Sequence, residues 1–373
     1  MRVALLADQP VDYAIAFANG LAPHARVTLI AAESRYAPLR RWIDPAVELR
    51  LVDWPRHRSL RNPAFLWRLT RTVRTVRPEL LHLLSNTALW LNLAMPLWRG
   101  LPLLTTIHDI ATHPGDRDTA TLPAWAPRLM VRLSPDVVVH GPSLARLAVQ
   151  RFAKSPERVH VLQHPAIRRY AELAHTGASA GGPGAPELPE TGGNGFRLLL
   201  FGRIFAYKGL DLLVEAERLL GPRIPGLAIT VAGRGDDPGA LRPRMGTPGR
   251  YDIRNRFIPD AEVARLFAAA DAVVLPYAEG SQSGVLHVAA TFGKPLVATD
   301  VGELGATVAR NRLGLVVPPG RADALAAALA TLAEDRMLRA ELGANALAWS
   351  RGANAPETVG RQALALYREI LRR

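Results

Sequence analysis

Residues 198–210 read LLLFGRIFAYKGL, and this stretch decides how the rest of the chain is interpreted. Its first four residues form an apolar run typical of a buried strand, and the run ends at Gly202, where the missing side chain lets a ligand approach the backbone. A helix that begins after Gly209 would present unpaired N–H groups and a positive dipole end to an anion. Arg203 and Lys208 add two full charges beside it. The stretch therefore predicts a diphosphate site, although both cations could equally be ordinary solvated side chains.

Lysine is rare in this chain, which makes its positions informative. Only three of the 46 basic residues are lysine, namely Lys154, Lys208 and Lys294, and the last two lie in motif-like turns. Where composition favours arginine, a compact ammonium group that persists suggests a point-charge role.

Length and composition indicate two domains. A chain of 373 residues with 49% hydrophobic residues has enough material for two cores. The absence of cysteine excludes disulfides and thiolate sites and fits a reducing compartment. Residues 1–8 have too short an apolar run for a signal peptide, and no uninterrupted apolar run reaches the length of a membrane span. We therefore expect a cytoplasmic protein.

The net charge of +13 predicts an anionic partner. Nucleic acid, acidic lipid and phosphorylated small molecules all satisfy that requirement. The sequence has no zinc-finger spacing, RNA-binding aromatic motif or isolated basic tail, so we expect no nucleic-acid partner.

Short apolar runs alternate with helical patterns in both halves of the chain, which predicts parallel sheets covered by helices. Strands are expected at residues 3–7, 27–31, 47–52, 80–84, 103–107, 137–140, 159–162, 197–201, 228–232, 251–257, 272–275, 295–299 and 314–317. The predicted fold class is α/β, with two doubly wound Rossmann-like domains facing a cleft and ligands outside the carboxyl ends of the strands.

The domain boundaries follow from a change in composition. Residues 171–195, AELAHTGASAGGPGAPELPETGGNG, are rich in Gly, Pro and Ala and are expected to form a linker or loop. Residues 1–170 then form an acceptor-side domain and residues 196–350 a nucleotide-sugar domain. Residues 351–373 are expected to form a C-terminal helix that crosses back to the first domain.

A second motif, LPYAEGSQSGVLH, occupies residues 275–287. Here a strand ends at a proline, and the carboxylate of Glu279 can accept hydrogen bonds from sugar hydroxyls. The Ser/Gly loop that follows would form a phosphate nest at a helix start, made by Ser281, Gln282, Ser283 and Gly284. The alternative is an ordinary helix with Ser283 as its N-cap.

Further motifs at residues 233–235 (GRG), 257–260 (FIPD) and 302–305 (GELG) follow in an informative order. With them, residues 197–317 resemble the retaining GT-B glycosyltransferases of family 4, many of which build bacterial polysaccharides. The resemblance implies hexosyl transfer from a UDP- or GDP-sugar to a glycan or lipid-linked acceptor in cell-envelope or exopolysaccharide synthesis.

The resemblance also implies roles for individual residues. Arg203 and Lys208 would hold the donor diphosphate, and Glu279 would contact the donor sugar as the first glutamate of the family's Glu-x7-Glu motif. Phe257 and Ile258 resemble the segment that packs on the nucleobase. The donor-binding set is then Gly202, Arg203, Lys208, Phe257, Ile258, Glu279, Ser281, Gln282, Ser283, Gly284 and Val285.

The chain departs from the family at the second glutamate of that motif, which usually holds the ribose. His287 stands eight residues after Glu279, and the neighbouring register gives Val288. The Ser-Gln-Ser-Gly variant resembles a subgroup that also lacks this acid.

The first half contributes a His-Asp pair at the end of a predicted strand. Read alone, His108 and Asp109 fit a hydrogen-bonded histidine beside a capping aspartate as well as a functional pair. Resemblance to the family's His-Asp turn implies that His108 acts near the donor sugar. Asp8, Tyr13 and Asp109 are the acceptor-side candidates, although the glycine pair common in the family near Asp8 is absent.

Residues 56–77 contain seven arginines and no acidic residue. Arg68, Arg71 and Arg74 recur at helical spacing opposite apolar residues, and Trp54 and Trp67 lie nearby. An amphipathic packing helix with a solvated face explains the pattern, and so does peripheral docking on an anionic membrane at the inner face of the cell membrane.

These observations predict a glycosyltransferase whose catalytic residues are His108, Glu279, Arg203 and Lys208. An Asp-x-Asp spacing, which metal-dependent transferases use to hold a metal, occurs once, at Asp116 and Asp118. We nevertheless expect neither a metal nor a cofactor, because the cations of the predicted diphosphate site can supply the positive charge. The alternatives are a GT-B sugar-nucleotide epimerase, which needs acid/base carboxylates, and a non-catalytic sugar-nucleotide binding protein.

Overall fold

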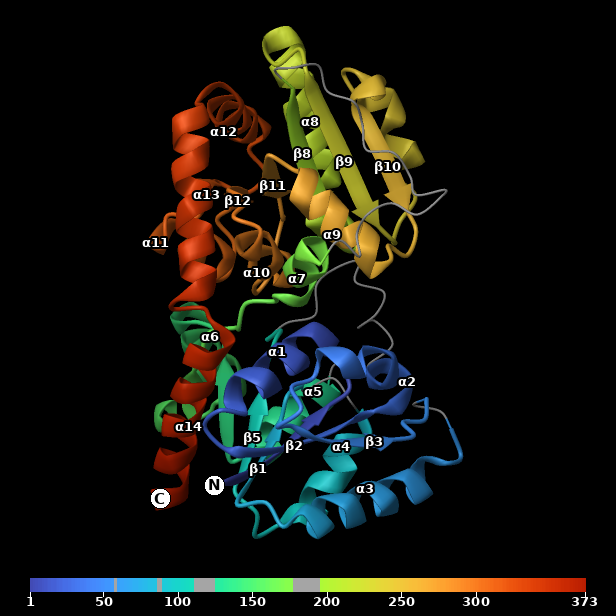
Figure 1. The fold of residues 1–373 in the computed structure, drawn as a ribbon, viewed down its shortest axis with the longest axis vertical. Coiled ribbons are helices and arrows are strands. Elements are labelled where there is room, and N and C mark those ends of the chain that lie inside the picture. The colour runs from blue at the N-terminus through green and yellow to red at the C-terminus, as the bar shows by residue number, and fades with distance from the viewer. Residues whose placement is uncertain (57–58, 86–88, 111–124, 177–194) are drawn as a thin grey trace. The chain divides into compact units, whose positions relative to one another are not determined.

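The computed structural model describes residues 1–56, 59–85, 89–110, 125–176 and 195–373. The chain folds into two compact units, each described here by itself (Figure 1). Unit 1 comprises the described residues between Met1 and Pro165 together with Ala353–Arg373. Unit 2 comprises Ala166–Gly352. The chain therefore returns to unit 1 at its C-terminal end.

Unit 1 is built on a parallel sheet with the strand order β3-β2-β1-β4-β5-β6-β7. The order reverses between β1 and β4, which makes the carboxyl ends of these two strands the switch point of the sheet. The strands are β1 (Arg2–Ala7), β2 (Arg26–Ala32), β3 (Glu48–Val52), β4 (Leu80–Leu83), β5 (Leu103–Thr106), β6 (Asp136–Val139) and β7 (Val159–Val161).

Helices cover both faces of this sheet because successive strand residues point to opposite sides. In β1, Val3 and Leu5 pack in the core under α1 and α14, whereas Ala4 and Leu6 pack in the core under α3 and α4. The helices are α1 (Val11–Leu21), α2 (Glu33–Tyr36), α3 (Asn62–Val76), α4 (Leu89–Ala94), α5 (Trp125–Leu133), α6 (Pro142–Phe152) and α14 (Pro356–Arg372).

Unit 2 repeats the architecture with the parallel strand order β10-β9-β8-β11-β12-β13. Its switch point lies between β8 and β11. The strands are β8 (Phe196–Phe201), β9 (Leu227–Gly233), β10 (Tyr251–Asn255), β11 (Ala272–Leu275), β12 (Leu296–Thr299) and β13 (Gly314–Val317). The helices are α7 (Arg169–His175), α8 (Leu210–Leu220), α9 (Asp260–Ala269), α10 (Gly284–Thr291), α11 (Leu304–Arg310), α12 (Ala322–Glu334) and α13 (Arg336–Arg351).

The predicted α/β class with two parallel sheets is confirmed, and the predicted strands agree with the observed ones to within about two residues at each end. One segment differs from its prediction. Residues 171–175, expected to begin a linker, belong to α7, because Tyr170 and Leu173 bury their side chains against unit 2 and Arg169 pairs with Asp260 of α9. The remainder of the expected linker, residues 177–194, lies outside the described residues.

No helix in the described part of the chain combines the length and the apolar character needed to cross a lipid bilayer.

Candidate functional site

The predicted diphosphate turn lies at the switch point of the unit 2 sheet, where β8 ends. Gly202 and Gly233, at the ends of β8 and β9, approach so closely that a Cβ on Gly233 would lie 1.7 Å from the carbonyl oxygen of Gly202. Gly233 has a φ of 147°, which a side chain would strain. The two glycines therefore keep this edge of the sheet free of side chains. Such an opening is what a ligand requires if it is to approach the backbone.

Lys208 connects this turn with the second motif. It ends a short 3₁₀ helix, Ala206–Lys208, and its Nζ lies 3.8 Å from the ring centroid of Tyr277 and 4.8 Å from that of Tyr207. The backbone N–H of Ala278 donates to the carbonyl oxygen of Tyr207 over 2.8 Å. A Cβ on Gly209 would lie 1.8 Å from the carbonyl oxygen of Pro276, so the two segments touch. The Arg-Lys turn and the Glu279 loop are therefore in direct contact.

The loop that carries Glu279 is held from within unit 2. The Thr299 hydroxyl donates to the carbonyl oxygen of Tyr277 over 2.6 Å, and the backbone N–H of Glu303 donates to the carbonyl oxygen of Ser281 over 2.8 Å. Glu279 itself is only partly buried. A fixed backbone with a partly exposed carboxylate is suited to receiving sugar hydroxyls.

Ser283 does not cap α10 through its side chain. It occupies the N-cap position, but its hydroxyl lies 2.8 Å from the Tyr277 hydroxyl. The simple capping alternative is therefore not what the structure shows. Val285, in the first turn of α10, lies beside Gly202, since a Cβ on that glycine would be 3.6 Å from Val285 Cγ2. The start of α10 thus borders the diphosphate turn, while Gln282 is half-buried between the two serines.

His287, which stands near the position of the second glutamate in the family pattern, is buried. Its side chain is 5% exposed, and its ring stacks on Trp349 of α13 with ring centroids 5.6 Å apart. The residue therefore contributes to the packing of α10 on α13.

The two candidate nucleobase residues, which follow β10, separate into one exposed and one buried side chain. Phe257 is 72% exposed, whereas Ile258 is 6% exposed and belongs to the core under α9. Of the pair, only Phe257 presents a ring that a nucleobase could stack on.

In unit 1, the predicted His-Asp turn follows β5, and His108 is oriented by the backbone. Its Nε2 lies 2.9 Å from the carbonyl oxygen of Leu84. A carbonyl oxygen only accepts, so Nε2 carries the proton of this bond. Burial lowers the pKa of His108, so the ring is neutral at pH 7 and Nδ1 bears a lone pair. His108 can thus accept a hydrogen bond from a sugar hydroxyl at Nδ1. Asp109 beside it is exposed.

The other two acceptor-side candidates, Asp8 and Tyr13, have side chains in different environments. Asp8, at the carboxyl end of β1, pairs with Arg35 at 2.8 Å and remains partly exposed. Tyr13 is fully buried, because it lies on the face of α1 that packs on the sheet. Burial keeps Tyr13 from the acceptor contact expected of it, and its ring instead packs nearly perpendicular to that of His108, with ring centroids 4.6 Å apart.

Two family models match the chain and between them cover most of it. "Glycosyltransferase Family 4" matches residues 11–166, and "Glycosyl transferases group 1" matches residues 195–335. The alpha-D-kanosaminyltransferase of Streptomyces kanamyceticus is 30% identical over 287 residues, which span 73% of this chain and 71% of the relative. The chain belongs to glycosyltransferase family 4. A D-inositol 3-phosphate glycosyltransferase of Jonesia denitrificans is also 30% identical, over 70% of this chain and 64% of the relative.

Solved structures share the GT-B fold of this glycosyltransferase. A Rickettsia africae glycosyltransferase superimposes with a TM-score of 0.71 at 15% identity, covering 100% of this chain and 98% of the other. Anabaena HepE, solved with UDP and glucose, gives a TM-score of 0.69 at 18% identity, covering 99% of this chain and 100% of the other.

Three histidines that the sequence analysis did not single out surround His108 and Tyr13 in the glycosyltransferase. His140 follows β6 with its ring centroid 5.1 Å from that of His108, and His164, after β7, lies 5.5 Å from His140. His82, within β4, lies 2.6 Å from the Tyr367 hydroxyl through Nδ1 and 2.8 Å from the Thr106 hydroxyl through Nε2. The sequence places His108 directly after one predicted strand and His140 at the end of another. Which side chains surround these two histidines depends on the order of the strands in the sheet.

We expect Tyr367→Phe to lower the free energy of unfolding of unit 1 by about 1–3 kcal/mol, because it leaves a buried nitrogen of His82 without its partner. Tryptophan fluorescence during urea unfolding measures this, since six of the seven tryptophans lie in unit 1. The control is Tyr36→Phe, because the buried Tyr36 hydroxyl has no partner among the described residues. Equal losses in both variants would contradict the assigned role of the Tyr367–His82 bond.

We also expect unit 1 to lose stability below pH ~6.5. Burial lowers the pKa of His82 to about 3 and also lowers that of His140, so unfolding must take up protons at both sites. The free energy of unfolding should then fall as the pH drops, by up to ~2.7 kcal/mol per pH unit for two histidines. Urea unfolding at several pH values measures this free energy. The control is His175→Gln at an exposed site, which should show the same pH dependence as the wild type. A free energy independent of pH in this window would be inconsistent with two neutral buried rings.

Proposed function

We propose that this glycosyltransferase moves a hexosyl unit, with retention of configuration, from a nucleoside diphosphate sugar to a glycan or lipid-linked acceptor in cell-envelope or exopolysaccharide synthesis. The observation that carries the proposal is the contact of Lys208 with the Tyr277 ring at 3.8 Å. It brings the cationic turn and the Glu279 loop into one site, which suits a ligand that has a diphosphate at one end and a sugar at the other.

The chemistry of the reaction explains why such a site needs cations. Breaking the bond between the sugar and the diphosphate leaves negative charge on the departing phosphate. Fixed positive charge where that charge develops lowers the barrier more than it strengthens substrate binding. Arg203, Lys208 and the start of α10 are the groups that we propose for this role. Because they supply the charge directly, we propose that the transfer needs no metal, and EDTA should leave turnover unchanged.

Glu279 and His108 are proposed to contact the donor sugar. A partly exposed carboxylate accepts hydrogen bonds from hydroxyl groups, and the neutral His108 ring accepts one at Nδ1. Exposed Phe257 is proposed to stack on the nucleobase. The relatives named above as transferases, and the UDP and glucose in the HepE structure, support a nucleotide-sugar donor.

Two steps test the proposal. A thermal-shift screen of UDP-, GDP- and ADP-sugars identifies the donor, since a ligand at 100 times its Kd adds about 2.7 kcal/mol to the free energy of unfolding. Incubation with that donor, labelled in the sugar, then distinguishes the activities. Transfer to an acceptor, or slow hydrolysis with release of nucleoside diphosphate, supports a transferase. An isomerised sugar would indicate an epimerase, and binding without turnover a non-catalytic module.

A further inference from the structure

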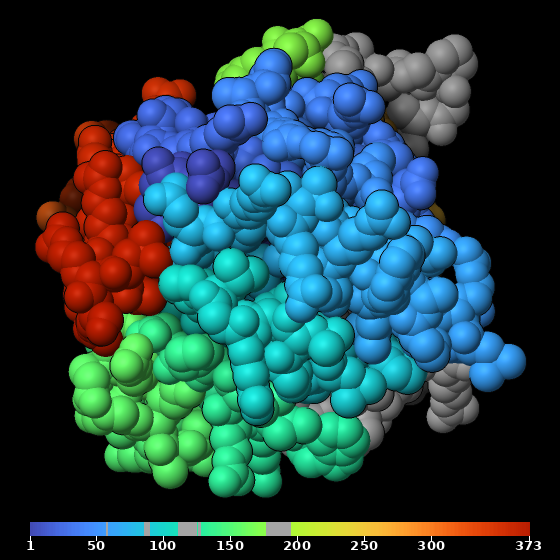
Figure 2. Space-filling model, turned by 90° about the horizontal axis from the view of Figure 1, so that it is seen from below, coloured from blue at the N-terminus to red at the C-terminus, as the bar shows by residue number. Residues whose placement is uncertain are grey.

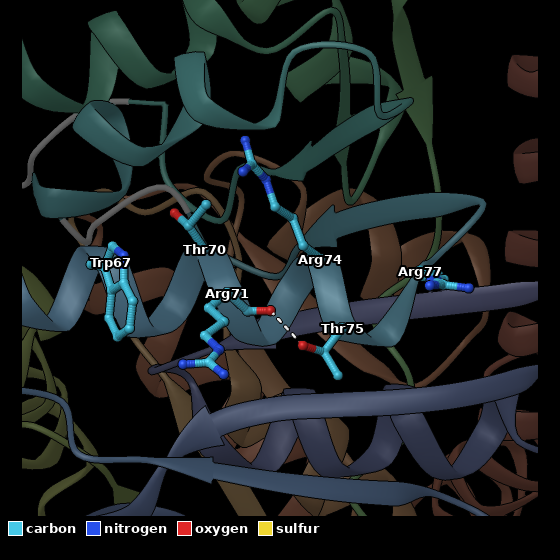
Figure 3. A pocket seen from close by; sticks show the side chains of 6 residues that line it. All are labelled: Trp67, Thr70, Arg71, Arg74, Thr75 and Arg77. Atoms are coloured by element: carbon cyan, nitrogen blue, oxygen red, sulfur yellow. Dashed lines mark hydrogen bonds between the residues drawn. The ribbon is translucent and has the colours of Figure 1, made fainter.

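A basic and apolar surface lies on α3 of unit 1. We call it the α3 face and define it by Trp67, Thr70, Arg71, Arg74, Thr75 and Arg77, which line an open hollow of about 690 Å³ (Figure 3). In Figure 3, Thr70 and Arg74 point to one side of the helix axis and Arg71 and Thr75 to the other. The helix itself contains no acidic residue.

The helix is held rigidly, so this face has a fixed shape. Phe65, Leu69 and Val73 are almost fully buried on the opposite side of α3, in the core beneath the sheet. At the N-terminal end, the side-chain amide of Asn62 donates to the carbonyl oxygens of Ser59 and Arg56. The packing alternative raised by the sequence is therefore correct for one side of the helix. It leaves the arginine side unexplained.

The arginines of the face are not neutralised by the part of the chain that the structure describes. Arg71 rests over the ring of Trp67 at 5.5 Å, and an Nη of Arg74 donates to the backbone oxygen of Leu97 over 3.3 Å. Neither contact involves an acid, and no ion pair with a described residue is found for Arg68, Arg71, Arg74 or Arg77. Their positive charge remains available to an anion.

The hydroxyl groups of α3 do not compete with the arginines for an anion. Thr72 and Thr75 donate to backbone oxygens one turn earlier. Thr70 is 8% exposed, and its Oγ1 is buried. The groups of this face that an anion can reach are therefore the arginines.

Apolar side chains beside the arginines decide which anion fits. Trp67 is 63% exposed, and Leu93 and Leu97, on the adjoining α4 and the 3₁₀ helix Met95–Trp98, are 57% and 48% exposed. Figure 2 shows the α3 and α4 segments, in sky blue and cyan, next to each other on one face of unit 1. Exposed aliphatic groups gain nothing from a nucleic-acid backbone. They gain burial at a bilayer interface, where arginines also meet lipid phosphates.

We propose that the α3 face docks on an anionic phospholipid bilayer, with its arginines against the headgroup phosphates and its exposed apolar side chains at the bilayer interface. This goes beyond the proposed sugar transfer. It also stands separately from it, because the residues proposed for the donor diphosphate belong to unit 2. Docking places the enzyme where a lipid-linked acceptor resides.

Cosedimentation with vesicles tests the proposal on the full-length protein. The wild type should bind phosphatidylcholine vesicles that contain phosphatidylglycerol and ignore pure phosphatidylcholine. Binding should weaken sharply as salt shortens the Debye length from about 10 Å at 0.1 M to about 3 Å at 1 M. The triple variant Arg68→Glu, Arg71→Glu, Arg74→Glu should bind about 10²-fold or more weakly, since each basic residue near an anionic surface contributes about fivefold in affinity.

A matched control separates the α3 face from net charge. Arg242→Glu, Arg310→Glu and Arg351→Glu together change the charge by the same amount at exposed sites of unit 2. This control should keep its vesicle affinity, and both triple variants should keep the wild-type thermal shift with the donor.

Three results would overturn the proposal. The first is a wild-type protein that ignores phosphatidylglycerol vesicles at low salt, and the second is an equal loss of binding in the control triple. The third is tighter binding to a fluorescent DNA duplex than to vesicles, abolished by the α3 triple, which would make the face a nucleic-acid surface. Loss of donor activity with vesicle binding intact would instead count against the proposed function alone.

Discussion

Replacing Arg203 or Lys208 with alanine should reduce turnover by about 10²-fold or more, if each contributes as much as a typical donor to a developing oxyanion. The two cations belong to the turn at the end of β8, and the partly buried Lys208 lies against Tyr277. Because the leaving diphosphate gains charge only as the bond to the sugar breaks, the loss should appear in kcat more than in KM. Steady-state kinetics with the donor identified by thermal shift measure it.

Arg310→Ala is the matched control for this experiment. It removes one exposed cation of unit 2 at the end of α11, so it has the same effect on net charge without touching the turn. The control should retain wild-type turnover, and all three variants should unfold near the wild-type temperature. Near wild-type turnover in Arg203→Ala or Lys208→Ala would remove the diphosphate assignment.

The second large effect is expected at Glu279. Glu279→Gln preserves the shape of the side chain but removes the charge that strengthens its hydrogen bonds to sugar hydroxyls. Transfer should fall by about 10²-fold or more, whereas the Kd for the bare nucleoside diphosphate, which lacks the sugar, should change little. Turnover assays combined with calorimetric titration of the nucleotide measure the two quantities separately.

His287→Ala tests the register of the motif to which Glu279 belongs. Because the His287 ring is packed on Trp349, its removal leaves a cavity and should cost stability of about 1–3 kcal/mol. Transfer should fall less than in Glu279→Gln. Equal losses of nucleotide affinity in the two variants would show that the motif has been placed in the wrong register.

Local patterns in the sequence were sufficient to locate most of the secondary structure that carries the candidate site. The apolar runs at residues 198–201 and 272–275 are buried strands, and the polar segment after each lies at the end of its strand. Burial on both faces of a parallel sheet requires continuous apolar runs, and such runs are visible without any knowledge of the neighbouring strands. The ends of these two runs, and of the run at residues 103–107, therefore place Gly202, Glu279 and His108 on loops.

Other features could not be predicted because they depend on which strands become neighbours. The ring contact between His108 and His140 exists because β5 and β6 pair, and the bond from Tyr367 to His82 exists because α14 returns to unit 1. Tyr13 follows β1 in a segment that sequence alone assigned to a ligand loop, but α1 begins there and turns the ring into the core.

The sequence by itself determined the α/β class, the positions of the strands, the family, and the residue types available at the strand ends. Those properties depend on short-range periodicity and on motifs that a single segment contains. The tertiary structure alone decided that Lys208 meets Tyr277, that Ser283 bonds to Tyr277 instead of capping α10, and that Arg71 lies over the ring of Trp67. The physical reason is that each of these depends on side-chain directions and on close contact between separate elements, which packing fixes only when the whole unit has folded.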